Sequence, residues 1–257
     1  MRFILIGDVI GRTGRNTLKE VLPEVKKKYK PDFIVINGEN LAGGYGITKK
    51  VFKEIDKLGI DVITSGNHIW DKKEIYQFID EEPKLLRPAN YPPMVPGRGY
   101  GIYEKNGKYI AVINLMGRVF MGIPLDCPFR KFDEIYNEIK DKVDYIIVDF
   151  HGEATSEKNA FGYYVDGRAT VVYGTHTHIP TADERILPKN TVYITDVGLT
   201  GAFQSVIGIE PKNSIKGFLT GLPQKYDVAK GEKIFNALFV EIDNFQIEME
   251  RIQIKIL

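Results

Sequence analysis

Short runs dominated by apolar residues, each separated from the next by a stretch with helical spacing, constrain the fold more than any other feature of this sequence. Residues 3–6, 33–36 and 61–64 are such runs, and a run without polar alternation is typical of a strand buried on both faces. Between them, apolar residues recur at helical spacing over 16–28 and 51–58. Strands that alternate with helices predict right-handed crossovers and a parallel sheet.

Local signals predict where these helices begin and end. Pro31 ends the first helix, and Pro23 inside it predicts a kink or a second short helix. Thr48 is the expected N-cap of the second helix, and Gly59 is its expected C-terminal stop. We expect a further helix over residues 71–79.

From residue 83 onward, the pattern predicts more strands than helices. Prolines and glycines over 83–101 predict a long surface excursion. The other expected elements are strands at 100–104, 108–115, 145–148, 170–173, 192–195, 234–242 and 246–256, and a helix at 132–139. Asn106-Gly107 and Asp243-Asn244 predict the turns of two hairpins. No internal repeat interrupts this pattern, so we expect one domain over residues 1–257.

Composition excludes several classes of protein. The chain has 257 residues, with 35 Lys+Arg against 34 Asp+Glu, and this balance argues against a long nucleic-acid track. No apolar run approaches the ~20 residues that span a bilayer, and none resembles a signal-peptide core, so we expect no membrane contact. A lone Cys127 cannot form an intramolecular disulfide, which fits a reducing compartment. We therefore expect a cytoplasmic protein.

Polar side chains follow five of the expected strands. In open α/β sheets, chemistry collects beyond the carboxyl ends of the strands. These positions hold Asp8, Glu39 with Asn40, Asn67 with His68, His151, and His176 with His178. All four histidines of the chain belong to this set. Imidazole, carboxylate and amide donors together favour Fe, Mn or Zn. There are more of these candidate ligands than one metal ion can coordinate. Two metal ions that share a bridging carboxylate are therefore expected.

Taken alone, most of these residues also have a structural explanation. Asp8 suits a helix N-cap, Asn67 suits a Gly-Asn turn, and a single histidine such as His151 is more often structural than a ligand. His176 and His178 differ, because alternation along an extended segment would place both rings on the same side. The structural explanations would all have to hold at once, which favours the metal site.

The polar strand ends occur in a distinctive order: Gly-Asp, Gly-Glu-Asn, Gly-Asn-His, His and Gly-x-His-x-His. This order resembles the calcineurin-like metallophosphoesterases, whose usual pattern is Asp-x-His, Gly-Asp-x-x-Asp, Gly-Asn-His-Asp/Glu and Gly-His-x-His. Here Ile10 stands where the first His is usual, and Glu39-Asn40 replaces the Asp region. Both departures, together with residues 66–71, 149–158 and 174–178, resemble the bacterial YmdB-like branch. That branch is associated with 2′,3′-cyclic-nucleotide 2′-phosphodiesterase activity and bound iron.

The resemblance implies a fold and a ligand set. The implied fold is a four-layer α/β/β/α sandwich of two mixed sheets, and a β/α barrel is the alternative. The implied ligands are Asp8, Glu39, Asn40 and His178 for one metal, and Asn67, His151 and His176 for the second, with Glu39 bridging. His68 is left without a metal and faces the substrate. Iron is the implied metal, with Mn²⁺ and Zn²⁺ as alternatives.

The implied reaction is hydrolysis of a small 2′,3′-cyclic nucleotide to a 3′-nucleotide. A metal-activated hydroxide would attack the phosphorus, and His68 would protonate the leaving 2′ oxygen. A phosphomonoesterase, a 3′,5′-cyclic phosphodiesterase or a nuclease on the same site is the first alternative, and a non-catalytic regulatory scaffold is the second. The sequence is compatible with a homo-oligomer. Residues 41–47 and 116–130 are expected to form pocket walls or subunit contacts.

Overall fold

The apolar runs near the N-terminus form the parallel part of the first of two sheets. The computed structural model describes residues 1–243 and 246–256. The strands of the first sheet are β1 (Arg2–Asp8), β2 (Phe33–Asn37), β3 (Val62–Thr64), β10 (Gly201–Ala202), β11 (Lys233–Asp243) and β12 (Gln246–Ile256). β1, β2 and β3 are parallel neighbours, whereas β11 pairs antiparallel with β1, β10 and β12. The first sheet is therefore mixed.

The second sheet is also mixed. Its strands, in spatial order, are β4 (Tyr100–Lys105), β5 (Lys108–Met116), β6 (Tyr145–His151), β7 (Val171–Thr175), β9 (Val192–Ile194) and β8 (Arg185–Ile186). β5, β6, β7 and β9 are parallel, and β4 and β8 pair antiparallel at the two ends. Asn106-Gly107 connects β4 to β5, as predicted. The turn predicted at Asp243-Asn244 includes a residue outside the described ranges.

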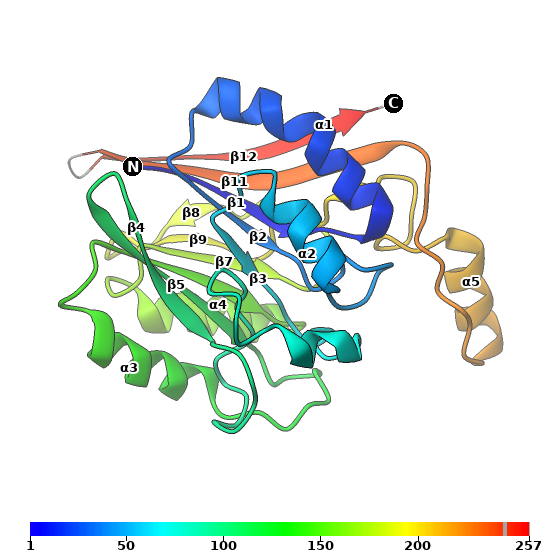
Figure 1. The fold of residues 1–257 in the computed structure, drawn as a ribbon, viewed down its shortest axis with the longest axis horizontal. Coiled ribbons are helices and arrows are strands. Elements are labelled where there is room, and N and C mark those ends of the chain that lie inside the picture. Colours follow the sequence, from blue (N-terminus) through cyan, green and yellow to red (C-terminus); the bar gives the residue numbers. More distant parts are fainter. Residues whose placement is uncertain (244–245, 257) are drawn as a thin grey trace.

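Helices cover the outer face of each sheet (Figure 1), and buried side chains of both sheets form a core between them. α1 (Gly11–Tyr29) and α2 (Lys49–Asp56) pack on the first sheet, and α3 (Pro128–Ile139) and α4 (Thr155–Val165) pack on the second. Leu5 of the first sheet and Val112 and Tyr173 of the second meet in the central core, each with 0% exposure. The four-layer α/β/β/α sandwich is therefore confirmed. α5 (Pro211–Thr220) stands at one end of the molecule.

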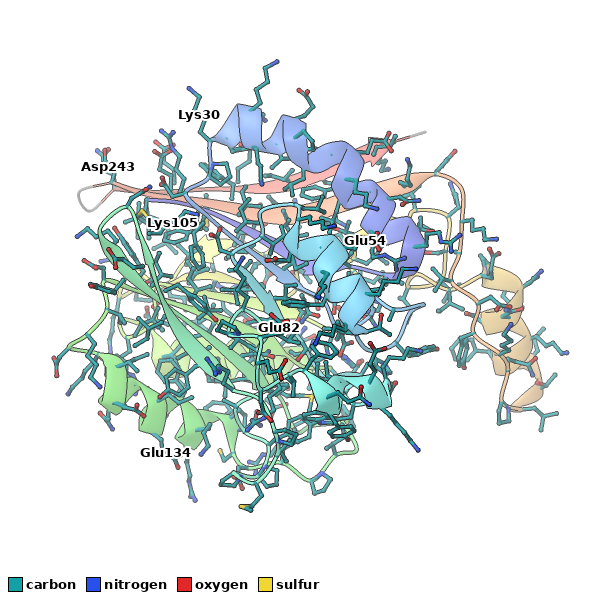
Figure 2. All side chains as sticks on the ribbon, in the orientation of Figure 1. Lys30, Glu54, Glu82, Lys105, Glu134 and Asp243 are labelled. Carbon is teal, nitrogen blue, oxygen red and sulfur yellow. The ribbon has the colours of Figure 1, made fainter. Side chains whose placement is uncertain are left out.

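Charged side chains lie on the outside of the helical layers. Glu54 on α2 pairs with Arg15 and Lys19 of α1, and Glu134 projects from α3 into solvent (Figure 2). The polar faces of these helices thus point away from the sheets, as their amphipathic spacing predicts.

Two of the predicted helices differ from the structure. The first begins at Gly11 and runs through Pro23 to Tyr29 as one helix, because its buried face on the sheet outweighs the helix-breaking cost of proline. The helix predicted over 71–79 is only a 3₁₀ turn, Lys73–Gln77. Asp71, its expected first residue, instead binds His68 through its side chain.

Other boundaries follow the sequence signals. Thr48 caps α2, and its hydroxyl oxygen accepts a hydrogen bond from the Val51 N–H at 3.3 Å. The sequence pattern missed α4 and α5, and the buried Lys158 on α4 interrupts the apolar face that would have indicated a helix. Within the described residues, no helix combines the length and the apolar character needed to cross a membrane.

Candidate metal centre

The carboxyl ends of strands from both sheets meet at one edge of the sandwich, and the expected site residues lie there. Asp8 ends β1, Glu39 and Asn40 follow β2, and Asn67 and His68 follow β3 in the first sheet. His151 ends β6, and His176 and His178 follow β7 in the second sheet. Asp8, Glu39, Asn40 and His151 are at most 3% exposed. All the site residues predicted from the sequence are therefore brought to one place.

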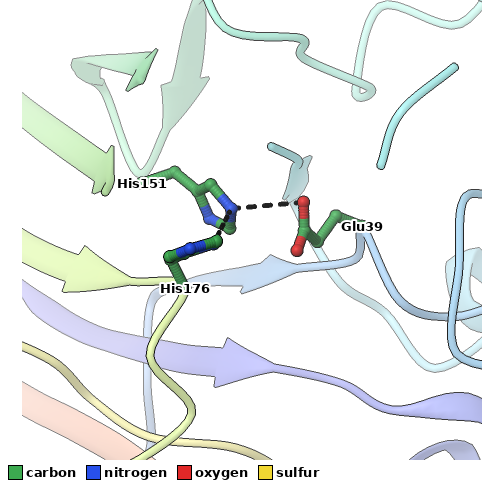
Figure 3. Close-up of side chains that lie close together, drawn as sticks. All are labelled: Glu39, His151 and His176. Atoms are coloured by element: carbon green, nitrogen blue, oxygen red, sulfur yellow. Dashed lines mark hydrogen bonds and ion pairs between the residues drawn. The ribbon is translucent and has the colours of Figure 1, made fainter. Parts of the chain in front are cut away.

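One group of potential ligand atoms surrounds His151 Nε2. This nitrogen lies 3.2 Å from Glu39 Oε2, 2.9 Å from Asn67 Oδ1 and 3.1 Å from His176 Nδ1. Figure 3 shows Glu39 and His176 pointing toward His151 from separate elements. A single N–H on this nitrogen cannot satisfy three acceptors at once. The convergence is instead typical of ligand atoms arranged around a cation.

A second group adjoins the first through Glu39. Ligand atoms of Asp8, Glu39 and His178 lie within 4.8 Å of one another. Two buried oxygens, Asp8 Oδ1 and Asn40 Oδ1, have no hydrogen-bond partner among the described residues. Since buried polar atoms are almost always partnered, these two fit a cation better than an apolar contact. Glu39 belongs to both groups, which is the arrangement expected of a bridging carboxylate.

The second ring nitrogen of each histidine in these groups is held by an oxygen. His151 Nδ1 lies 2.9 Å from Thr175 Oγ1, which itself donates to Asp149. His176 Nε2 lies 3.0 Å from Glu153 Oε2, and His178 Nδ1 donates to the Ile207 carbonyl at 2.8 Å.

Such partners fix the tautomer of a metal-binding histidine and are typical of metal sites. They leave His151 Nε2, His176 Nδ1 and His178 Nε2 to act as ligands. Of these nitrogens, His151 Nε2 faces Glu39 and His178 Nε2 faces Asp8, whereas His176 Nδ1 faces His151 Nε2. The residues present therefore fit a metal centre.

The electrostatics of the cluster favour a cation. Burial opposes charge on His151, but the carboxylates of Glu39, Asp8 and Asp149 together outweigh it and raise the histidine pKa to about 9. Burial, together with the positive His151 ring, lowers the pKa of His176 to about 3. Burial also raises the pKa of Asp8 above its usual range. Buried carboxylates thus favour positive charge at this point, and a bound metal ion would supply it.

The sequence prediction for His176 and His178 needs one correction. The segment is not extended: both residues have left-handed backbones, with φ of 98° and 67°. The two rings therefore enter different groups rather than share one side of a strand. Asp196 stabilises this turn, because its carboxylate accepts from the Thr177 N–H at 3.1 Å and from the Thr177 hydroxyl at 2.8 Å.

Several supporting residues were missed by sequence reasoning. Glu153 contacts His176, and Lys158 and Asp196 form a buried ion pair of 2.7 Å beneath the turn. Asp196 follows β9, so the rule of reading the residues beyond each strand would have found it. Lys158 lies within α4, where nothing in the local pattern distinguishes it from a solvated lysine.

His68 lies beside these groups rather than within them. Its backbone N–H donates to Glu39 Oε2 at 3.1 Å, and its ring Nδ1 lies 2.8 Å from Asp71 Oδ2. The ring lines a pocket together with Gly44 and Tyr45, from one of the predicted wall segments. The other predicted segment, residues 116–130, lines a separate cavity.

Two mixed sheets that carry this donor set at their carboxyl ends define a metallophosphoesterase. A family model described as YmdB-like protein matches residues 4–254. The chain belongs to this YmdB-like family.

Relatives and solved structures agree with this assignment. The chain is 51% identical to a Bacillus subtilis (strain 168) protein named 2′,3′-cyclic-nucleotide 2′-phosphodiesterase, over 99% of this chain and 97% of that protein. A Mycoplasma pneumoniae structure described as a novel phosphatase superimposes with a TM-score of 0.93 at 38% identity, covering 99% of this chain and 93% of that one. A structure of a Thermus thermophilus protein has the same TM-score of 0.93 at 41% identity and covers 99% of both chains.

Proposed function

We propose that this protein is a metal-dependent phosphodiesterase that hydrolyses 2′,3′-cyclic nucleotides to 3′-nucleotides. One observation carries the proposal: two groups of ligand atoms share Glu39, and His68, which belongs to neither group, lies beside them. The name of the Bacillus subtilis relative supports the substrate class. Hydrolysis of the bond to the 2′ oxygen leaves the phosphate on the 3′ oxygen.

The ligand assignment is part of the proposal. We assign Asp8, Asn40 and His178 to one metal ion, and Asn67, His151 and His176 to the other, with Glu39 shared. Iron is the proposed metal, with Mn²⁺ and Zn²⁺ as alternatives, because mixed nitrogen and oxygen donors suit all three. When bound, such ions polarise the phosphoryl group and lower the pKa of water.

His68 is the proposed proton donor. An alkoxide leaves poorly, and a positioned acid typically accelerates its departure ~10²–10⁴-fold. Asp71 engages Nδ1 of the ring, which leaves Nε2 to deliver a proton to the departing 2′ oxygen. The His68 side chain is 29% exposed, so a substrate can reach it.

Metal analysis combined with an assay of three substrates tests this function. Anaerobically purified protein should contain about two metal ions per chain, mainly iron. It should hydrolyse 2′,3′-cAMP faster than 3′,5′-cAMP or p-nitrophenyl phosphate, and the product should be 3′-AMP. A preference for the monoester, for the 3′,5′ ring or for release of 2′-AMP would contradict the proposal. Metal-free protein without activity on any of the three would favour the scaffold.

We also propose that residues 1–257 act as one domain. The core between the sheets combines Phe3, Val171 and Leu238, which come from distant parts of the chain. The lone Cys127 supports a cytoplasmic location.

A further inference from the structure

A pocket of about 340 Å³ opens directly beside the candidate metal centre. Asn40 and His178 of the centre line the pocket, and so does His68, which lies beside the centre. A substrate with its phosphate at the centre must therefore extend a further part of itself into this space or past it. The volume lies at the small end of the range for ligand sites, which suits one ring system rather than a chain.

The walls of the pocket are apolar and aromatic. Ile10 and Ile207 contribute aliphatic surface, and Tyr45, Phe218 and Tyr226 contribute aromatic rings. Among the described residues that line the pocket, none is Lys, Arg, Asp or Glu. The walls thus favour an uncharged, flat group and offer no cation to a second phosphate.

The metal centre and the pocket walls are joined by hydrogen bonds. The ring Nδ1 of His178 donates to the Ile207 carbonyl at 2.8 Å, and the Asn40 amide donates to the Gly44 carbonyl at 2.9 Å. The Tyr45 ring meets the His68 ring edge-on at a centroid distance of 4.9 Å. His178, Asn40 and His68 therefore help to fix the position of the residues that line the pocket.

Phe218 is the most solvent-exposed of the apolar and aromatic residues that line the pocket. It lies on α5 and is 87% exposed, although it also borders the pocket. A base stacked on this ring would bury apolar surface that is otherwise in water, and such stacking stabilises a bound nucleotide. Stacking tolerates any base, because every base has an aromatic face.

We propose that this pocket is the nucleobase subsite, in which Phe218, Tyr45 and Tyr226 hold the purine or pyrimidine of the substrate. This inference rests on the proposed function and deepens it. The subsite contributes affinity through ring stacking, whereas the chemistry takes place at the adjoining centre. Substitution of Phe218 should consequently raise KM and leave kcat nearly constant.

Two substrates separate the subsite from the centre. One is 2′,3′-cAMP, and the other is methyl β-D-riboside 2′,3′-cyclic phosphate, which has the same reacting group but no base. Phe218→Ala should raise the KM for 2′,3′-cAMP about tenfold and leave the KM for the base-free substrate unchanged. Leu219→Ala is the matched control, because Leu219 is the next residue of α5, is 82% exposed and lies outside the pocket lining.

The outcomes distinguish this inference from the proposed function. An equal effect of Phe218→Ala on both substrates, or no effect on either, would overturn the base subsite while the phosphodiesterase stands. If the wild-type protein hydrolyses neither substrate, the phosphodiesterase fails, and calorimetric titration with adenosine still tests the pocket. Wild type should then bind adenosine about tenfold more tightly than Phe218→Ala. Equal affinities would overturn the subsite.

Discussion

Gly66 determines how closely the two sheets can approach at the metal centre. A Cβ atom at this position would lie 2.3 Å from His151 Nε2 and 2.4 Å from Glu39 Oε2. Both atoms belong to the donor set and are buried with their residues, so neither can withdraw without leaving its group. The Gly-Asn-His sequence therefore needs its glycine for space at the centre, in addition to any role in the turn.

His68 offers a test of catalysis that leaves the ligand groups intact. His68→Ala should keep the metal content of wild type and lose ~10²–10⁴-fold in kcat on 2′,3′-cAMP, because no acid protonates the leaving oxygen. An aryl phosphodiester, whose leaving group needs little protonation, should lose far less. Steady-state kinetics with both substrates and elemental analysis provide the measurements. Full activity of the variant on 2′,3′-cAMP would remove His68 from the mechanism.

At the scale of elements, α4 supports the turn that follows β7. Lys158 on α4 is 1% exposed. It donates to the Thr175 carbonyl at 2.6 Å and to Asp196 Oδ2 at 2.7 Å. The same Asp196 oxygen accepts both hydrogen bonds from Thr177, which lies between His176 and His178. The helix thus holds the ligand turn from below, through the buried ion pair with Asp196 and the hydrogen bond to Thr175.

Removal of this lysine should destabilise the protein. Lys158→Met leaves the Asp196 carboxylate buried without its cation, and breaking a buried pair in this way costs about 3–5 kcal/mol in the free energy of unfolding. Urea denaturation with linear extrapolation measures it. The control is Lys225→Met, because Lys225 pairs with Asp227 on the surface and should leave the midpoint unchanged. If both variants unfolded at the same urea concentration, the buried ion pair would make no contribution to the stability of the protein.

The sequence predicted strands well where both faces of the strand are buried. Runs such as 33–36 are buried on both faces, so they appear as uninterrupted apolar residues, and the strands are found where expected. α4 was missed because its buried face includes Lys158. The sequence predicted a helix over 71–79 where the structure has only a 3₁₀ turn at 73–77. The spacing of apolar residues cannot reveal that the Asp71 side chain binds His68.

The site was more predictable than its geometry. Parallel strands bring their carboxyl ends to the same edge, so polar residues after several strands must meet there. Periodicity cannot reveal the left-handed backbone of His176 and His178, because a left-handed φ depends on hydrogen bonds such as those to Asp196. The oxygens behind the ligand nitrogens, such as Glu153, come from tertiary contacts that carry no local pattern.

At the scale of the whole molecule, the candidate metal centre connects the two sheets, which otherwise contact each other through the apolar core. Asp8, Glu39 and Asn67 lie at or just beyond strand ends of the first sheet, and His151 and His176 at or just beyond those of the second. Bound metal should therefore stabilise the docked sheets, because ligands that are separated in the unfolded chain bind weakly. A ligand at 100 times its Kd adds about 2.7 kcal/mol to the free energy of unfolding.

Removal of metal tests this link. Protein treated with a chelator should unfold at a lower temperature than the same protein reloaded with Mn²⁺, as measured by circular dichroism. His176→Ala should show a smaller shift and a lower metal content, whereas Leu219→Ala on the exposed surface of α5 should show the full shift. An identical midpoint with and without metal would mean that the centre does not hold the sheets together.

The long β12 strand has a consequence for how copies of this protein meet. It pairs with β11 along its full length, and in the described part of the chain its other edge has no strand partner. Open edges invite strand addition and fibril growth. Glu248, Glu250 and Lys255 occupy exposed positions along this edge, so a second chain that paired there would have to bury charge. These charges therefore disfavour edge-to-edge aggregation through β12.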